Sequence, residues 1–200
     1  MTIKTLYSST FAPNPMRVNH MLKLKGVDHE FIDINILQGE QMTPEFKAIN
    51  PDSTIPVMVL DDGTKMCDTI GILHYLEKTY PEKKLMGSST IEQANILSMM
   101  HRIFVSGFLA VAEGVRNGLV PGFEGRALPG PVPVEQIPEL VTRGKKRLIT
   151  FYQTMEASLE GKTFLIGEDV SQADIDLFVC CNFAGMIKQS FDADTYPNLA

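Results

Sequence analysis

The chain has no tryptophan, four histidines and three cysteines in 200 residues. The cysteines are odd in number, and Cys180 and Cys181 are neighbours, which does not suit the disulfide framework of a small secreted protein. We therefore expect reduced thiols and a cytoplasmic protein. There is no Cys-x-x-Cys, and the histidines are scattered without ligand spacing, so we predict no metal site.

An excess of positive charge and a long apolar run are also missing. The chain has 18 Lys and Arg and 24 Asp and Glu, which gives a net charge of -6. This sign does not favour binding to the phosphate backbone of a nucleic acid. The most apolar stretch, residues 103–112, is shorter than the roughly 20 residues that a bilayer core requires. Residues 1–7 lack the apolar region and cleavage site of a secretory signal. We expect neither a nucleic-acid partner nor a membrane span.

The first eighty residues alternate between strand and helix patterns at short intervals. Strands are predicted at 3–7, 29–35, 57–60 and 65–67, and helices at 14–25, 43–49 and 68–80. Asn14–Pro15 and Thr43–Pro44 each combine an N-cap residue with a proline at the first helical position. Asp62–Gly63 is a hairpin signal, so the last two strands are antiparallel. The predicted order is βαβαββα.

The second half of the chain is predicted to be all helical. A long helix runs from 90 to about 117, and another from 139 to 159. Residues 119–138 are rich in glycine and proline and form a long loop, of a length that is usually functional or mobile. Ser171-Gln-Ala-Asp174 resembles a capping box that opens a buried helix. The buried positions predicted for that helix are Ile175, Leu177, Phe178 and Val179.

Two local features of the first half suggest a binding site. Pro56 stands directly before a strand, where proline is tolerated; from the residues alone its peptide bond is expected to be trans. Asp68 and Thr69 open a helix whose free N–H groups form an anion site, although both could simply cap that helix. Cys67 is interpreted as a semi-buried strand thiol, since no motif places a histidine base beside it.

Several of these motifs, in order, resemble the glutathione S-transferase family over nearly the whole chain. The matching segments are Asn50–Pro51, Ile55–Pro56, Asp62–Gly63, Asp68–Thr69, Ile72–Leu76, Ile166–Asp169 and Ser171–Ile175. The resemblance implies an α+β, thioredoxin-like N-terminal domain over residues 1–82, followed by an all-α helical bundle domain over 88–200. Family members usually continue into a final helix, so we expect further chain after Ala200.

The resemblance also implies a glutathione site. Pro56 would be cis, and the backbone of Ile55 would pair with the cysteinyl part of glutathione as a short added strand. Asp68 and Thr69 replace a Glu and a Ser that hold the γ-glutamyl end. Thr54 occupies a position that is often basic in relatives, so one contact to the glycyl carboxylate is either lost or supplied elsewhere.

A transferase must keep the sulfur of glutathione as a thiolate. Lowering a thiol pKa from about 8.5 by two units takes about 2.7 kcal/mol, and one hydrogen bond to a charged group contributes about 1.5 to 3 kcal/mol, so one donor is enough. The serine of the zeta-class pattern is Ala12 here, whereas Ala12-Pro-Asn14 resembles the nu-class pattern, whose Asn amide lies at the sulfur. We predict Asn14 as the activating residue, with Ser9 and Thr10 as alternatives, and interpret Tyr7 as a strand residue.

A second-substrate surface is predicted on the long helix. The residues Met99, Arg102, Ile103 and Ser106 share one helical face. Core packing or a dimer contact would explain the same stripe. The resulting hypothesis is a homodimeric transferase in which glutathione, as co-substrate, attacks a small hydrophobic electrophile. The alternatives are glutathione-dependent disulfide or peroxide reduction, and a binding module that has lost catalysis.

Overall fold

The protein was analysed as a computed structural model that describes residues 2–200, with the side chain of Leu119 excepted. The chain divides into two compact units, which are described separately. The first extends to Lys83 and includes Leu128–Val134. The second comprises Lys84–Ala127 and Glu135–Ala200.

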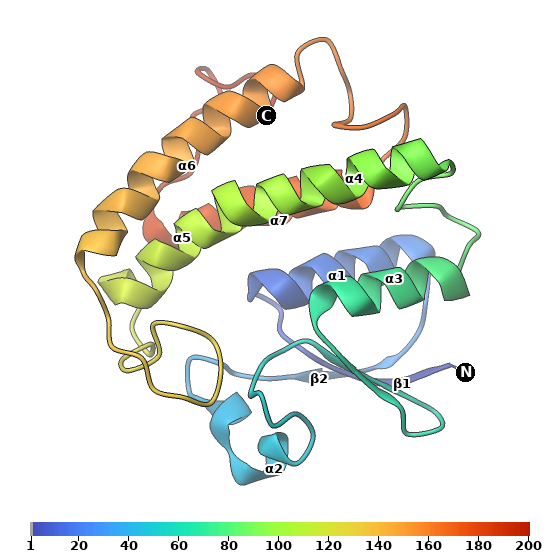
Figure 1. Ribbon diagram of the computed structural model, residues 1–200, viewed down its shortest axis with the longest axis vertical. Helices are drawn as coiled ribbons and strands as arrows, with labels where there is room; N and C mark the ends of the chain where they lie inside the picture. The colour runs from blue at the N-terminus through green and yellow to red at the C-terminus, as the bar shows by residue number, and fades with distance from the viewer. Residues whose placement is uncertain (1) are drawn as a thin grey trace. The chain divides into compact units, whose positions relative to one another are not determined.

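The first unit is built on a four-stranded mixed sheet (Figure 1). Its elements are β1 (Ile3–Ser8), α1 (Pro13–Lys25), β2 (Glu30–Asp33), the 3-10 turn η1 (Glu40–Met42), α2 (Pro44–Lys47), β3 (Val57–Leu60), β4 (Lys65–Cys67) and α3 (Thr69–Thr79). The strand order is β2-β1-β3-β4, with β1 and β2 parallel and the other two pairs antiparallel. The predicted order βαβαββα and the antiparallel hairpin are confirmed.

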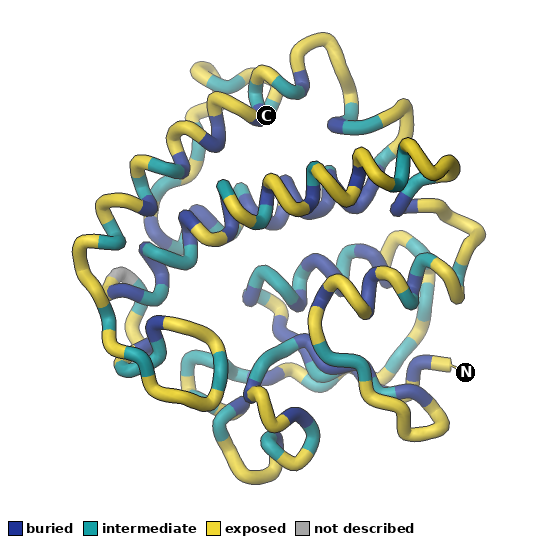
Figure 2. Tube along the Cα trace, viewed as in Figure 1, coloured by how far each residue is buried: buried dark blue, intermediate teal, exposed yellow. Residues whose placement is uncertain are grey.

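Helices α1 and α3 lie side by side on one face of the sheet, with buried positions recurring along both (Figures 1 and 2). The even positions of β1 face this layer, since the Ser8 hydroxyl donates to Asn19 Oδ1 of α1 at 2.8 Å. The odd positions face α2, where Tyr7 meets the ring of Phe46 edge-on at 6.1 Å. Tyr7 is therefore a strand residue, as predicted, and its side chain packs on the α2 side of the sheet.

The start of α1 differs from the prediction. Asn14 was expected as N-cap, but the N-cap is Ala12, with extended dihedrals of φ -72° and ψ 135°, and Pro13 is the first helical residue. Proline fits that position because its φ is fixed near the helical value and its missing N–H is not needed there. The helix ends at Gly26 with φ 66°, a left-handed C-cap that glycine adopts without strain. Strand β2 is also shorter than the 29–35 predicted.

The second unit is helical. Its elements are α4 (Thr90–Ile103), the π-turn η2 (Phe104–Phe108), α5 (Leu109–Gly114), the π-turn η3 (Val115–Leu119), α6 (Glu139–Ser158), α7 (Gln172–Ala184) and the 3-10 turn η4 (Gly185–Ile187). Helix α4 packs beside α7, and α5 beside α6 (Figure 1). Ser171 and Asp174 form the predicted capping box at the start of α7. Phe178 is 56% exposed, so its predicted burial is wrong, whereas Ile175, Leu177 and Val179 are buried as predicted.

Among the described residues, one helix, spanning 90–118, is long and apolar enough to cross a membrane by length and composition alone. The apolar stretch at residues 103–112 is only part of this helix, whose predicted span from 90 to about 117 agrees with the structure. Ile96, Met100 and Ile103 of this helix are buried within the helical unit. Core helices of this kind have the same composition, so the observation is weak evidence of a span.

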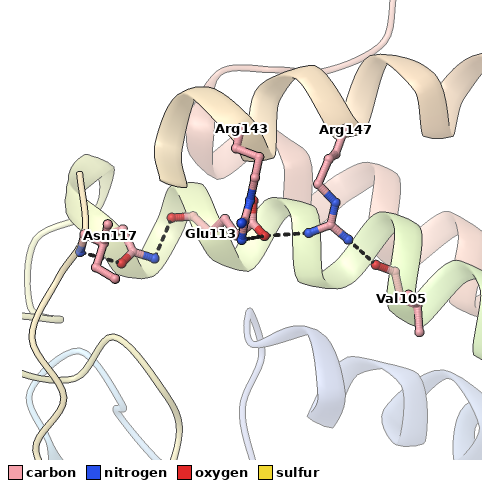
Figure 3. Close-up of polar contacts among 6 residues, drawn as sticks. Val105, Glu113, Asn117, Arg143 and Arg147 are labelled. Atoms are coloured by element: carbon pink, nitrogen blue, oxygen red, sulfur yellow. Dashed lines mark hydrogen bonds and ion pairs between the residues drawn. The ribbon is translucent and has the colours of Figure 1, made fainter. Parts of the chain in front are cut away.

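The α5–α6 pair is held by a close approach and a charged network. Gly144 of α6 lies so near α5 that a Cβ atom there would overlap the carbonyl oxygen of Ala110. Glu113, whose side chain is 11% exposed, accepts hydrogen bonds from Arg143 and Arg147 of α6 (Figure 3). Arg147 also donates to the carbonyl of Val105, in the first π-turn. Backbone proximity and the pairing of two arginines with a largely buried carboxylate therefore support the same helix crossing.

Candidate glutathione site

The strand register gathers three segments at one edge of the sheet in the first unit. Tyr7 of β1 is paired with Val57 of β3, and Val57 is paired with Cys67 of β4. The loop that leaves β1, the loop that enters β3 and the turn that leaves β4 therefore meet at one end. Two helices, α1 and α3, begin there, so the positive ends of both helix dipoles face this edge. The glutathione-binding and activating residues predicted from the sequence all lie on these three segments.

The loop that enters β3 contains the cis peptide bond Ile55–Pro56. The trans bond expected from the residues alone is therefore wrong, and the cis bond expected from the family resemblance is confirmed. None of the described residues hydrogen-bonds the backbone N–H or carbonyl of Ile55. An extended segment could therefore pair with Ile55 as an added strand. Ile55 is half-buried, and Pro56 is buried beneath it.

Asn50 fixes the shape of this loop. The side chain is 1% exposed, and Nδ2 donates to the carbonyl and the hydroxyl of Thr54 at 2.9 and 3.0 Å. Its Oδ1 accepts from the backbone N–H of Asp52 at 3.1 Å. Ser53 sits between them with φ 54°, in the left-handed region that non-glycine residues seldom adopt. The Thr54 side chain, a predicted ligand contact, is thus already engaged within the loop.

Asp68 and Thr69 begin α3. Asp68 occupies the N-cap position with φ 69° and ψ 132°, but its carboxylate makes no hydrogen bond to its own helix, so the simple capping interpretation is wrong for the side chain. With φ at 69°, Asp68 also departs from the extended backbone conformation that N-cap residues typically have. The carboxylate of Asp68 is exposed and is available to a ligand, whereas Thr69 is buried.

The start of α1 offers few backbone donors. Pro13 and Pro15 have no N–H, so Asn14 supplies the only backbone N–H among the first three helical positions. Ser9 is fully buried, and its hydroxyl accepts from the N–H groups of Phe11 and Ala12, both at 3.4 Å. Its oxygen is thereby used as an acceptor within the loop, and burial removes the hydroxyl from solvent.

Thr10 and Asn14 have the greater exposure. Thr10 is exposed, and its backbone N–H donates to Asp33 Oδ1 at 3.2 Å. Asn14 is half-buried, and its Oδ1 accepts from the Arg17 guanidinium at 3.1 Å. Because the oxygen is occupied, the Nδ2 donors are the part of the Asn14 amide left to face another acceptor.

Arg17 is a structural residue of α1 and not a surface charge. The side chain is 2% exposed, one turn inside α1. It acts on the Asn14 amide through the hydrogen bond above. The signal available in the sequence was the spacing, since residues i and i+3 share a helix face.

Cys67 is a free, half-buried thiol beside this edge. Burial raises its pKa above the ordinary value, and the carboxylates of Asp68 and Asp52 raise it further. A raised pKa keeps the thiol protonated near neutral pH, which is the opposite of what a nucleophilic cysteine needs.

The predicted second-substrate residues lie in the helical unit with different exposures. Ile103 is fully buried in the core, Met99 is half-buried, and Arg102 is exposed. The Ser106 hydroxyl donates to the carbonyl of Arg102 at 2.7 Å. Met99, Arg102 and Ser106 therefore remain accessible to some degree, while Ile103 packs inside. Over residues 2–200 the structure brings together no group of three or more His, Cys, Asp or Glu side chains that could hold a metal ion.

These features define a class of protein. A βαβαββα sheet with a cis proline before its third strand and two helix N-termini at the same edge is a thioredoxin-like domain, and it continues here into a helical unit.

The family follows from comparison with known proteins. The model for the N-terminal domain of glutathione S-transferases matches residues 6–84, and the model for their C-terminal domain matches residues 91–200. The chain belongs to the glutathione S-transferase family. The family and the fold predicted from the sequence are thereby confirmed.

Individual relatives agree with this assignment. A zeta-class glutathione S-transferase of Euphorbia esula is 31% identical over 174 residues, which cover 86% of this chain and 72% of the relative. A maleylacetoacetate isomerase of Mus musculus is 28% identical over 202 residues, covering 98% and 83%. The crystal structure of a glutathione S-transferase domain-containing protein from Marinobacter aquaeolei VT8 superposes with a TM-score of 0.83 at 28% identity, covering 98% of this chain and 93% of that one.

Proposed function

We propose that this protein is a glutathione transferase, in which the thiolate of glutathione attacks a small electrophile. The observation that supports the proposal most is the register Tyr7–Val57–Cys67, which assembles the cis-proline loop and two helix N-termini at one edge. Residues 1–82 would bind glutathione, and residues 88–200 would contribute to binding the electrophile. A homodimer in the cytoplasm is part of the same proposal.

Glutathione would bind by its backbone and its charged ends. The cysteinyl part would pair with the unpaired backbone of Ile55, next to Pro56. The α-ammonium group of the γ-glutamyl end would pair with the Asp68 carboxylate. The α-carboxylate of the γ-glutamyl end would accept hydrogen bonds from the N–H groups at the start of α3, where Thr69 lies. Thr54 would contribute its backbone, since its hydroxyl already binds Asn50.

The sulfur would be held as a thiolate by Asn14. Its Nδ2 group and its backbone N–H are the donors at the start of α1, and the helix dipole favours an anion there. Arg17 would orient the amide by occupying Oδ1. Ser9 is the weaker alternative because its hydroxyl is buried, and Thr10 is accessible but lies outside the helix.

A second candidate reaction is glutathione-dependent isomerisation, favoured by the maleylacetoacetate isomerase of Mus musculus among the relatives. The thiolate would add to a conjugated double bond, the resulting single bond would rotate, and the thiolate would leave. Glutathione is then recovered unchanged, whereas a transferase leaves it bonded to the product. Mass spectrometry of the products separates the two reactions, and turnover confined to disulfides or hydroperoxides would favour the reductase alternative.

Glutathione binding and thiol ionisation test the proposal directly. Calorimetry is expected to show saturable binding of glutathione, and ultraviolet absorbance is expected to show a bound thiol with a lowered pKa. Replacing Asn14→Ala removes one hydrogen bond to the charged sulfur, so the pKa of the bound thiol should rise by about 1 to 2 units.

The variants Ser9→Ala and Thr10→Ala are the matched controls and should leave that pKa in place. An unchanged titration in Asn14→Ala together with a shift in either control would transfer the activating role to a hydroxyl. No binding of glutathione to the wild-type chain would leave only the non-catalytic module.

A further inference from the structure

The loop between α5 and α6 encloses a second group of polar residues, all within the helical unit. Gln136 donates from Nε2 to the carbonyl oxygens of Arg116 (3.1 Å) and Phe123, and accepts from the N–H of Gly125 at 3.0 Å. Asn117 Oδ1 accepts from the N–H of Ile137 at 2.9 Å (Figure 3). Side-chain bonds thus close the ends of a glycine- and proline-rich segment around one aromatic ring.

Two guanidinium groups flank that ring. The Cζ atoms of Arg116 and Arg126 lie 4.8 and 5.5 Å from the centroid of Phe123, within range of a cation–π contact. Phe123 is 4% exposed, while both arginines are half-buried and therefore reachable from solvent. Arg116 Nη1 donates to the carbonyl oxygen of Arg126 at 3.0 Å, and Arg126 donates to that of Gly122.

The surroundings of Arg116 carry little negative charge. Burial and the neighbouring charge of Arg126 lower the pKa of Arg116 to about 10, well below its ordinary value. Carbonyl oxygens satisfy N–H donors but carry no net charge, and among residues 2–200 no carboxylate forms an ion pair with Arg116. A buried cation beside a second cation is unfavourable unless an anion compensates it.

The backbone at this point is also irregular. Arg116 lies in the π-turn η3, a helical distortion that is frequent at functional sites. Within the same turn Asn117 and Gly118 leave helical geometry, at φ -105° and φ 132°. The irregular turn ends the helix where Arg116 can reach the ring of Phe123.

We propose that Arg116 and Arg126 form a binding site for the carboxylate of a small organic acid, with Phe123 as its apolar floor. Guanidinium groups match the planar, two-oxygen shape of a carboxylate and bind it bidentately. The site belongs to the helical unit and requires no glutathione, so it goes beyond the transferase proposal and can stand if that proposal fails.

Titration with succinate at constant ionic strength tests this site, with inorganic phosphate as the second probe. Succinate is expected to bind saturably to the wild-type chain and to raise its melting temperature. The affinity should fall at least tenfold in Arg116→Gln and in Arg126→Gln. Lys146→Gln, which removes an exposed positive charge from α6, is the matched control and should bind succinate as the wild type does.

Several outcomes would overturn the proposal. These are the absence of saturable binding, an equal loss of affinity in Lys146→Gln, tighter binding of phosphate than of succinate, or displacement of succinate by saturating glutathione. Far-ultraviolet circular dichroism shows whether each variant folds. If Arg116→Gln does not fold, Arg126→Gln decides, because it removes the second guanidinium beside the ring of Phe123.

Discussion

Asn50 shapes the loop of the candidate site, a role that the sequence did not indicate. It belonged to a motif of the family resemblance, yet no role could be given to it from the residues. In the structure one buried side chain makes three hydrogen bonds that wind the loop before Pro56. Arg17 is a similar case, since its burial and its bond to Asn14 depend on packing that a sequence does not display.

Replacing Asn50→Ala should lower the free energy of unfolding by about 1 to 3 kcal/mol, because three partly buried groups of Asp52 and Thr54 lose a hydrogen bond. Glutathione affinity should fall as well, since the backbone of Ile55 is positioned by this loop. Asn50→Asp is the matched control: it keeps the acceptor for the N–H of Asp52 but loses both donors to Thr54. Urea unfolding and calorimetry with glutathione measure the two effects, and full stability in Asn50→Ala would contradict this account.

Helix pairs in the two units use glycine in opposite ways. Gly144 lies where α6 crosses α5, and a Cβ there would lie 2.9 Å from Cβ of Glu113 as well as overlapping a backbone oxygen. Gly71 lies on the exposed side of α3, with no atom within 4 Å of the position of a Cβ. Glycine therefore permits the close approach of α6 to α5, whereas in α3 it only lowers the stability of the helix.

The pair of variants Gly144→Ala and Gly71→Ala separates these effects. Gly144→Ala should cost about 1 to 3 kcal/mol of stability, because the added methyl group forces the two backbones apart. Gly71→Ala should stabilise the chain by about 0.5 to 1 kcal/mol, through the better helix propensity of alanine. Thermal unfolding of both variants measures the difference, and equal shifts in the same direction would show that the α5–α6 approach is less tight than described.

At the scale of the whole molecule, several weak acids are held neutral by burial. Burial raises the pKa of Cys181 to about 12 from an ordinary value of 9.0. It also raises the pKa of Tyr152, and the neighbouring Cys181 and Cys180 raise it further. Burial raises the pKa of Cys67 as well, on the first unit. The unfolded chain therefore releases these protons at lower pH than the folded chain does.

Stability should consequently fall in alkaline solution. The contribution of Cys181 to the free energy of unfolding is fully present below about pH 9 and is lost progressively as the pH rises to about 12. The loss is about 1 kcal/mol at one pH unit above the pKa of the unfolded chain. Cys181→Ala should flatten the alkaline fall, and Cys67→Ala, the control with the smaller burial, should change it less. Urea unfolding between pH 8 and about 10.5 measures the slopes. A fall of the same steepness in Cys181→Ala would contradict the assignment.

The elements and their order were determined by the sequence alone. Turn signals at Asp62–Gly63, the capping box at Ser171–Asp174 and the period of the apolar residues act within a few neighbours, so they can be interpreted without tertiary contacts. The start of α1 could not be predicted in this way. Ala12-Pro13 and Asn14–Pro15 offer competing first turns, and packing selects the earlier one.

The family resemblance named the residues of the candidate site, but only the tertiary structure decided what brings them together. Segments near residues 12, 55 and 68 meet because three strands pair in one register, a contact between distant parts of the chain that no local pattern encodes. The same holds for the burial of Arg17 and for the approach of Arg116 and Arg126 to Phe123. Charge and hydrogen bonding at these places depend on which groups folding removes from water, and that is settled by packing.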